Sequence, residues 1–263
     1  MSGGNGQLGK ALNRWRSLRE RRLERRMAAT KLLRAFADQY PRAFVIEIGA
    51  NDGVEHDPIR PFLIEGHWRA ILVEPAPEAF VRLQRNYADA GDRIELVNVA
   101  IANHDGHVPF FSLDRVEGDA RERLDVFGSL SADAIRTSAA IFVPEEHRRI
   151  SRSEVPCLRF ESFCERHGVV GIDLLIVDVE GFDFEVVKQL DFELRRPRLL
   201  TYEHLLLSPA DRESCRQLLE RHGYETLAER RDTWCLDTRF DDALTRTWRR
   251  LRPVVPADSI YSG

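Results

Sequence analysis

The chain has 263 residues, of which 43% are hydrophobic and 31% are charged, and its formal net charge is −4. This length allows one domain with a substantial core, and the composition is typical of a soluble globular protein. No apolar stretch approaches the roughly 20 residues of a membrane span. The N-terminus lacks the apolar core of a signal peptide, so we expect a cytoplasmic protein.

The cysteine spacing excludes two further classes of protein. None of the four cysteines forms a C-x-x-C pair; they are Cys157, Cys164, Cys215 and Cys235. Neither a zinc site nor a disulfide framework is therefore indicated, and we expect reduced thiols that are mostly buried.

Residues 1–40 form a basic extension, with a charge of +7 against −11 for the rest of the chain. Apolar side chains recur among its arginines at roughly helical spacing, at Leu8, Leu12, Trp15, Leu18, Leu23, Met27 and Leu33. This pattern predicts a basic amphipathic helix. We expect it to pack on the domain or on a second subunit of a homo-oligomer. Binding to nucleic acid, a membrane surface or an anionic substrate is the alternative.

Strands and helices alternate after this extension. We expect strands at 43–48, 70–74 and 94–99, separated by helices at 59–65 and 77–87. The Asp105-Gly106 turn signal precedes an extra strand pair that includes 108–112. Residues 113–153 are polar and lack a firm periodicity, which indicates a lid, a substrate-binding insertion or disorder.

The alternation resumes after this insertion. The expected strands are 156–160, 172–178, 199–203, 224–227 and 233–236, and the expected helices are 161–167, 184–190 and 209–222. Such alternation predicts an α/β fold, doubly wound around a mostly parallel sheet with right-handed crossovers. Residues 41–238 would form this domain, and residues 239–263 a C-terminal helix and tail.

The loop after the first strand reads Glu47-Ile48-Gly49-Ala50-Asn51-Asp52-Gly53, and Glu74 ends the second strand. Its glycines allow backbone to approach a ligand, and the second-strand carboxylate can accept hydrogen bonds from a ribose diol. The G-x-x-x-G spacing differs from the G-x-G-x-x-G of dinucleotide folds, which disfavours a nicotinamide dehydrogenase. An acid beside the loop repels phosphates and attracts cations, which favours S-adenosylmethionine (SAM). A strand, turn and helix without ligand is the structural alternative.

Four ordered motifs resemble the FkbM family of class I SAM-dependent methyltransferases, over about residues 43–228. Residues 47–53 resemble its D-I-G-A-N-x-G loop, and 74–80 its E-P-x-P-x-x-F segment. Residues 98–106 are similar to the stretch after strand three, and 172–181 to I-D-x-L-K-I-D-x-E-G. The resemblance implies a Rossmann-like seven-stranded sheet with a reversed last hairpin. It also implies methyl transfer to a hydroxyl, often of a sugar or polyketide-type molecule.

Three positions depart from the family pattern. Glu47 replaces the more usual Asp, which keeps the charge and lengthens the side chain. Ile176 stands where the family often has Lys, and Asp183 where it often has Glu. The acceptor is therefore expected to differ from that of better-known members.

The predicted cofactor residues surround the loop and the next two strand ends. Glu47, Gly49, Asn51 and Gly53 would surround the amino-acid end of SAM, Glu74 the ribose, and the Val99-Ala100 backbone the adenine, with Asp105 as a further candidate. Ser129 in the insertion is a candidate for a substrate or cofactor contact.

The predicted catalytic residues follow the fourth and fifth strands, namely Asp178 and Glu180, then Glu203 and His204. Because parallel strands end at one edge of a sheet, we expect these side chains to converge near the cofactor. Asp178 or His204 would remove the acceptor hydroxyl proton, and Glu180 or Glu203 would orient the base or the substrate. Mg²⁺ held by Asp178, Glu203 and His204 is a further candidate. As structural alternatives, Asp178 would cap a helix and His204 would pair with its neighbouring glutamate.

Two other functions stay open. The basic extension suggests a nucleic-acid methyltransferase, but an acidic core disfavours phosphate binding and an Asn/Asp-Pro-Pro-aromatic tetrapeptide is absent from the sequence. A non-catalytic SAM-binding or assembly protein could retain the same fold. The intact loop with Glu74 argues against it.

Overall fold

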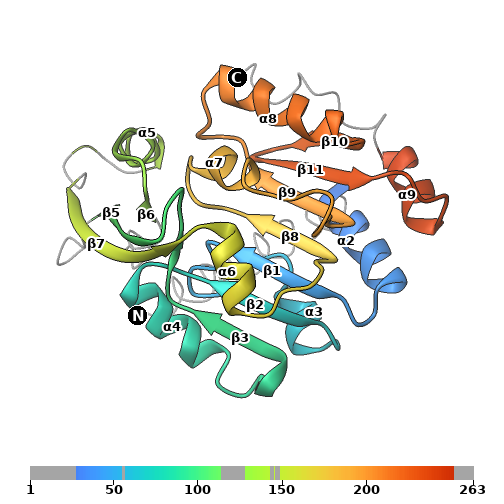
Figure 1. The fold of residues 1–263 in the computed structure, drawn as a ribbon, viewed down its shortest axis with the longest axis horizontal. Coiled ribbons are helices and arrows are strands. Elements are labelled where there is room, and N and C mark those ends of the chain that lie inside the picture. The colour runs from blue at the N-terminus through green and yellow to red at the C-terminus, as the bar shows by residue number, and fades with distance from the viewer. Residues whose placement is uncertain (1–27, 55–56, 114–127, 143–144, 146–148, 252–263) are drawn as a thin grey trace, which may run out of the picture.

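A seven-stranded sheet forms the centre of the computed structural model, which describes residues 28–54, 57–113, 128–142, 145 and 149–251 (Figure 1). Its strands are β1 (Phe44–Ile48), β2 (Arg69–Val73), β3 (Ile94–Val97), β8 (Leu174–Val177), β9 (Leu199–Glu203), β10 (Tyr224–Glu229) and β11 (Asp232–Asp237). Their order is β10-β11-β9-β8-β1-β2-β3. Strands β1, β2, β3, β8 and β9 are parallel, and β11 runs antiparallel to both β9 and β10. The predicted α/β class, with its reversed last hairpin, is confirmed.

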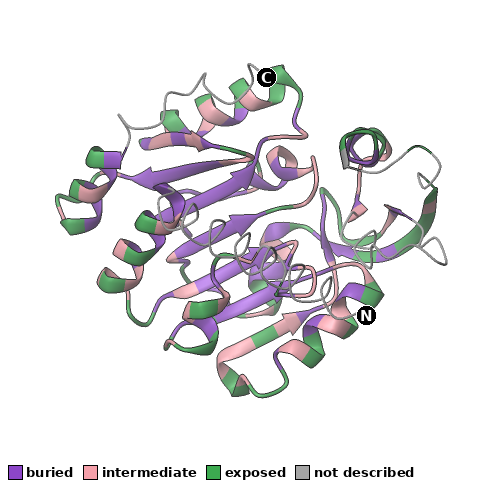
Figure 2. Ribbon diagram, turned by 180° about the vertical axis from the view of Figure 1, so that it is seen from behind, coloured by how far each residue is buried: buried purple, intermediate pink, exposed green. Residues whose placement is uncertain are grey.

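The central strands are buried on both faces, as their sequences require. All four residues of β8, Leu-Leu-Ile-Val, are buried. Continuous apolar runs of this kind are typical of parallel strands that helices cover on both sides. In Figure 2 the central strands are purple, whereas the surrounding helices carry exposed green positions.

Helices cover both faces of this sheet. On one face lie α6 (Phe160–Arg166), α7 (Asp183–Val187) and α8 (Pro209–Arg221), which share a core with Ile46 and Ile48 of β1. The other face is covered by α2 (Ala28–Gln39), α3 (Arg60–Ile64), α4 (Pro77–Asn86) and α9 (Ala243–Leu251), which share a core with Val45. Because side chains alternate along a strand, Glu47 points toward this second face with Val45.

A second sheet stands beside the first, to the left in Figure 1. Its strands are β4 (Ala100–Ile101), β5 (Gly106–Leu113), β6 (Gly128–Ser129) and β7 (Ile150–Leu158), in the order β4-β7-β5-β6. The extra strand expected at 108–112 is present as part of β5, but its main partner is β7 from the far side of the insertion.

One expectation about this part of the chain is corrected, and another segment gains detail. The third strand of the central sheet ends at Val97 rather than Val99, because Ala100 and Ile101 pair with β7 in the second sheet. The segment 113–153, which lacks a clear periodicity, contains helix α5 (Ala132–Phe142) and the start of β7. Small alanine side chains form much of α5, so its apolar stripe is weak in the sequence. Residues 114–127, 143–144 and 146–148 lie outside the described part.

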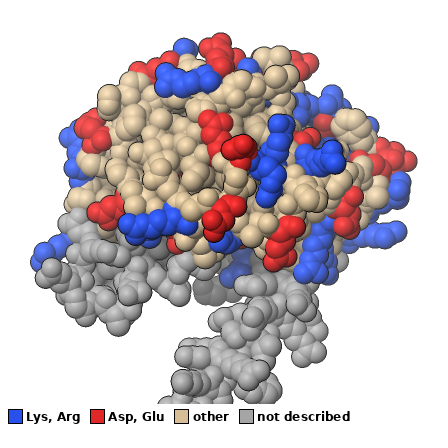
Figure 3. Space-filling view, turned by 90° about the horizontal axis from the view of Figure 1, so that it is seen from below, with Lys and Arg blue, Asp and Glu red and all other residues tan. Residues whose placement is uncertain are grey.

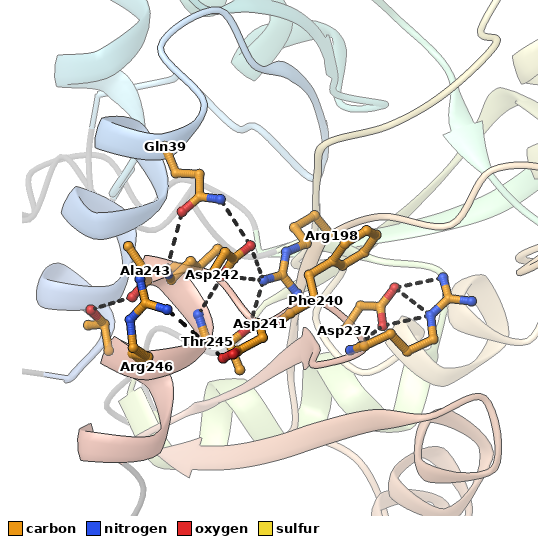
Figure 4. A network of polar contacts seen from close by, with 12 residues as sticks. Gln39, Arg198, Asp237, Phe240, Asp241, Asp242, Ala243, Thr245 and Arg246 are labelled. Atoms are coloured by element: carbon orange, nitrogen blue, oxygen red, sulfur yellow. Dashed lines mark hydrogen bonds and ion pairs between the residues drawn. The ribbon is translucent and has the colours of Figure 1, made fainter.

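The two ends of the described chain pack together. The Glu229 carboxylate accepts hydrogen bonds from the backbone N–H groups of Ala28 (2.8 Å) and Ala29 (2.7 Å) at the start of α2. Figure 4 shows Asp242, before α9, between Gln39 of α2 and the buried Arg198 before β9. Most of the predicted basic helix, residues 1–27, and the tail 252–263 lie outside the described residues, whereas Leu33 is buried in α2.

All four cysteines are free and buried. Among the described residues no helix has both the length and the apolarity that a membrane span requires.

Candidate functional site

The loops that follow β1 and β8 touch at the edge of the sheet where the parallel strands end, here called the carboxyl edge. Gly49 has φ +93°, and a Cβ built on it would lie 1.7 Å from the carbonyl oxygen of Asp178. Only glycine allows both this conformation and this approach. The backbone N–H of Asp178 also donates to the carbonyl of Ile48 (2.9 Å). The sequence-predicted Gly49 and Asp178 are therefore direct neighbours.

Glu74 at the end of β2 holds the glycine loop in place. Its two carboxylate oxygens accept hydrogen bonds from the backbone N–H groups of Asn51 (2.9 Å) and Ala76 (2.8 Å). Asn51 itself has φ +47°, an uncommon conformation for a residue with a side chain. Burial raises the pKa of Glu74 to about 7, although the two backbone donors act in the opposite direction. The side chain of Asn98 donates to the Glu74 carbonyl (2.7 Å), which links the ends of β2 and β3.

Glu47 is a buried acid with an unsatisfied carboxylate oxygen. Its side chain is 5% exposed, and its Oε2 is buried without a hydrogen-bond partner among the described residues. Burial, followed by repulsion from Asp57, Asp178 and Glu74, raises its pKa well above the usual range. A buried carboxylate oxygen without a donor costs free energy, and a cationic ligand group would relieve that cost.

The far side of the loop is fixed by residues that sequence reasoning missed. A Cβ on Gly53 (φ +67°) would lie 2.4 Å from the ring of Tyr87, so Tyr87 packs directly against the loop. The Tyr87 hydroxyl donates to Asp57 (3.1 Å), and Arg60 donates to the Gly53 carbonyl (3.0 Å). The side chain of Asn86 donates to the carbonyl of Asp52 (2.8 Å). The sequence gives little signal for these contacts, because each joins residues from different helices or loops.

The predicted catalytic carboxylates do converge. One ligand atom from each of Asp178, Glu180 and Glu203 lies within 4.8 Å of the others, and we call these three residues the acidic cluster. Burial, followed by repulsion from Asp178, raises the pKa of Glu203 to about 8. Burial, then repulsion from Glu203 and Asp178, raises the pKa of Glu180 well above its usual range. Arg231 is the cation in contact: its Nη2 lies 2.6 Å from Glu203 Oε1 and 3.9 Å from Glu180 Oε1.

Asp183, the departure from the family pattern noted above, positions two members of the acidic cluster. It is fully buried, and its carboxylate accepts hydrogen bonds from the backbone N–H groups of Gly181 (3.1 Å) and Glu203 (3.1 Å). The loop that carries Glu180 is thereby fixed to the end of β9.

His204 takes a different place from the one the predicted magnesium site requires. It is 5% exposed, and its Nδ1 lies 2.9 Å from the hydroxyl oxygen of Thr233. Burial, assisted by Arg212, lowers the pKa of His204 to about 4, so the ring is neutral at pH 7. The residues close enough together to hold a metal ion are those of the acidic cluster, which contains Glu180 instead of His204.

The insertion contacts the site through its described part. The hydroxyl of Ser129 donates to the Glu180 carbonyl (2.7 Å) and accepts from the Ser131 N–H (2.9 Å). A Cβ on Gly181 would lie 2.7 Å from the Cβ of Ala134 in α5. The predicted contact residue Ser129 thus anchors the insertion to the loop that carries Glu180.

The remaining predicted cofactor residues lie around the second sheet. Ala100 belongs to β4, where it pairs with Cys157, and Val99 packs on the main core. Both oxygens of the exposed Asp105 are engaged at the start of α6, by the backbone N–H of Arg159 (2.7 Å) and the hydroxyl of Ser162 (2.8 Å). These two bonds lower the pKa of Asp105. They give this residue a structural role.

One hollow of about 720 Å³ lies at the opposite, amino edge of the sheet. It is lined by residues at the start of β1, β2 and β3 and before β8, with Arg69, Glu95 and His167 among them. Ligands of open α/β sheets bind outside the carboxyl ends of the strands. The candidate site is therefore the carboxyl edge, where the glycine loop and the acidic cluster meet.

A family model described as the methyltransferase FkbM domain matches residues 47–226, which is more than half of the chain. The chain belongs to the FkbM methyltransferase family. The predicted resemblance is confirmed, and the match includes the glycine loop, the acidic cluster and the whole insertion of this FkbM methyltransferase.

Two curated relatives of this FkbM methyltransferase are methyltransferases by name. It is 28% identical over 164 residues to the 2-O-methyltransferase NoeI of Sinorhizobium fredii. This alignment covers 62% of this chain and 64% of NoeI, so the chain spans less than two thirds of that relative. It is 24% identical over 208 residues to the methyltransferase sdnD of Sordaria araneosa, covering 74% of this chain and 78% of sdnD. The crystal structure of methyltransferase FkbM from Methylobacillus flagellatus aligns with a TM-score of 0.46 at 11% identity, covering 74% of this chain and 44% of that one.

Proposed function

We propose that this methyltransferase transfers a methyl group from SAM to a hydroxyl of a small molecule or glycan, such as a sugar or a polyketide-type compound. The observation that carries the proposal is the buried Oε2 of Glu47 beside the glycine loop, which has no hydrogen-bond partner among the described residues, in a chain of a methyltransferase family. The 2-O-methyltransferase name of NoeI supports a hydroxyl acceptor. A cytoplasmic location belongs to the same proposal.

The residues at the carboxyl edge fit the methyl donor. Glu47 offers a carboxylate to its ammonium group. Each oxygen of Glu74 accepts one backbone hydrogen bond and keeps a second lone pair, with which it can accept from ribose hydroxyls. The Val99-Ala100 backbone lies beyond the end of β3, where we place the adenine. When bound, SAM supplies a methyl group that its sulfonium already activates for displacement.

The acceptor hydroxyl must lose a proton, and we assign its removal to Asp178. Asp178 is exposed at the carboxyl edge, whereas His204 is buried and its Nδ1 contacts Thr233. Glu180 and Glu203 would orient the hydroxyl. His204, held neutral by burial, would act as a positioning residue at the end of β9.

Single-turnover methylation with radiolabelled SAM and a panel of sugar and polyketide-type alcohols tests the assignment. Asp178→Asn is expected to lower the transfer rate by about 10²- to 10⁴-fold, the usual contribution of a general base. Its SAM affinity should stay within a few-fold of wild type. Arg85→Gln, on the solvent side of α4, is the matched control and should have no effect. A near-normal rate for Asp178→Asn, with a large loss for His204→Gln, would reverse the assignment.

Nucleic acid is disfavoured as the acceptor. Basic and acidic side chains are interspersed over the described part of the face in Figure 3, whereas backbone recognition of nucleic acid needs a gathered basic surface. The most basic segment, residues 1–27, lies outside the described residues. A non-catalytic SAM-binding or assembly protein would bind SAM and give no transfer with any acceptor of the panel.

A further inference from the structure

Arg231 reaches the acidic cluster from a two-residue turn. Arg230 and Arg231 connect β10 to β11, and Glu229 pairs with Asp232 across the hairpin. Asp232 in turn pairs with Glu203 of β9, and the His204 N–H donates to the Arg231 carbonyl (2.8 Å). The strand register therefore places Arg231 beside the end of β9, next to Glu203.

The guanidinium of Arg231 makes the contacts with Glu203 and Glu180. One nitrogen, Nη2, lies between Glu203 and Glu180, 2.6 Å and 3.9 Å from their Oε1 atoms. The Glu203 side chain is 2% exposed, and Oε2 of both glutamates is buried without a hydrogen-bond partner among the described residues. Each glutamate thus keeps an acceptor oxygen for another donor, such as an acceptor hydroxyl.

The acidic cluster requires a positive charge. Asp178 repels both Glu180 and Glu203, and Asp183 and Asp232 add to the negative field on one or the other. Arg231 is the attracting charge for both glutamates. A divalent ion bound by the same oxygens would lie within a few ångströms of the guanidinium and would be strongly repelled by it. The guanidinium and a divalent ion therefore exclude each other.

From this geometry we propose that Arg231 is the resident cation of the acidic cluster and stands where a divalent metal ion would otherwise bind. It acts as a positioning residue that holds Glu203 and Glu180 for the acceptor. This role rests on the proposed methyl transfer at the same site. The enzyme accordingly works without a divalent metal, and truncation of Arg231 converts the acidic cluster into a metal site.

Binding of Mn²⁺ to the full chain, followed by electron paramagnetic resonance, tests the proposal without any methyl transfer. Arg231→Ala is expected to bind one Mn²⁺ at least tenfold more tightly than wild type. The matched control is Arg230→Ala, the exposed neighbour on the same turn, which should bind Mn²⁺ as wild type does. Glu203→Gln added to Arg231→Ala should remove the new site, which locates it in the acidic cluster.

Activity gives the second readout, with Arg231→Lys as the conservative variant. Arg231→Ala should lower kcat about 10- to 100-fold with little change in the KM for SAM, and millimolar guanidinium or Mn²⁺ should restore part of the rate. Lysine should retain more activity than alanine and bind no Mn²⁺. Wild-type activity should be unaffected by a chelator.

Two results would overturn the inference: a folded Arg231→Ala protein that binds Mn²⁺ no better than wild type, or tight Mn²⁺ binding by wild type at the acidic cluster. If Arg231→Ala does not fold, the Arg231→Lys and Arg231→Gln proteins decide, because only glutamine should create the Mn²⁺ site. A chain that binds no SAM but shows this Mn²⁺ pattern would refute the proposed function and leave the cation assignment standing.

Discussion

Replacement of Glu47 by glutamine should change the stability of the ligand-free protein and its affinity for SAM in opposite directions. The folded structure raises the pKa of Glu47 above its value of 4.5 in a free chain, chiefly by burial. The group therefore contributes its full stability below pH 4.5, and that contribution is lost as the pH rises through the folded-state pKa. At pH 8 the burial of Glu47 therefore makes the ligand-free fold less stable than it is below pH 4.5.

Glutamine keeps the shape and removes the charge. Relief of the buried carboxylate should raise the free energy of unfolding at pH 8 by about 1–3 kcal/mol, the cost of leaving a buried polar group unsatisfied. A chain of this size gains about 2–4 °C in Tm per kcal/mol. The SAM complex loses a charge-assisted hydrogen bond of about 1.5–3 kcal/mol, which weakens binding about 10- to 100-fold.

Differential scanning calorimetry at pH 5 and pH 8 measures the first effect, and titration calorimetry with SAM the second. The Tm gain of Glu47→Gln should be larger at pH 8 than at pH 5. Glu65→Gln, an exposed glutamate on the same face of the sheet, is the control and should change neither quantity. A lower Tm with unchanged SAM affinity would refute the reasoning and make Glu47 a structural residue.

Three further predictions concern other parts of the molecule. Asp242→Ala removes the carboxylate partner of the buried Arg198 guanidinium and should lower the free energy of unfolding in urea by about 2–4 kcal/mol. Asp241→Ala is the control: its side chain is 83% exposed, and the free energy of unfolding should change by less than about 0.5 kcal/mol. The His204 pKa of about 4 lies below its usual 6.5, so its contribution to stability is present above pH 6.5 and is lost as the pH falls toward 4. Acid titrations of stability should therefore lose about 3 kcal/mol over this range in wild type but not in His204→Gln. A normal NMR-measured pKa for this ring would contradict the prediction. Gly49→Ala should lower the free energy of unfolding by more than about 3 kcal/mol and abolish SAM binding. Gly168 has φ +61°, but a Cβ there meets nothing within 4 Å, so Gly168→Ala should lower the free energy of unfolding by only about 1 kcal/mol. Equal losses would contradict the close approach of the two loops.

The fold and the donor half of the site could be predicted because their signals are local. Short apolar runs such as β8 predict buried strands, and the glycines of residues 47–53 mark a turn that needs left-handed backbone. The acids at 178, 180 and 203 could be expected to meet because they follow parallel strands of one sheet, and they do.

The parts that escaped prediction depend on contacts between distant segments. Arg231 sits on a turn without glycine or asparagine, and its place beside Glu203 follows from the register of β11 on β9. The exclusion of His204 from the group with metal-ligand spacing follows from its contact with Thr233 on that same strand. The pairing of β5 with β7 spans the insertion, so no local sequence pattern reports it.

SAM titration into two variants tests the central claim, that the cofactor binds at the carboxyl edge. Glu74→Ala removes the carboxylate that holds the glycine loop, and Glu95→Ala alters the hollow at the amino edge. We expect titration calorimetry to show SAM binding that Glu74→Ala weakens at least tenfold and Glu95→Ala leaves unchanged. Binding that persists in Glu74→Ala but is lost in Glu95→Ala would contradict the account.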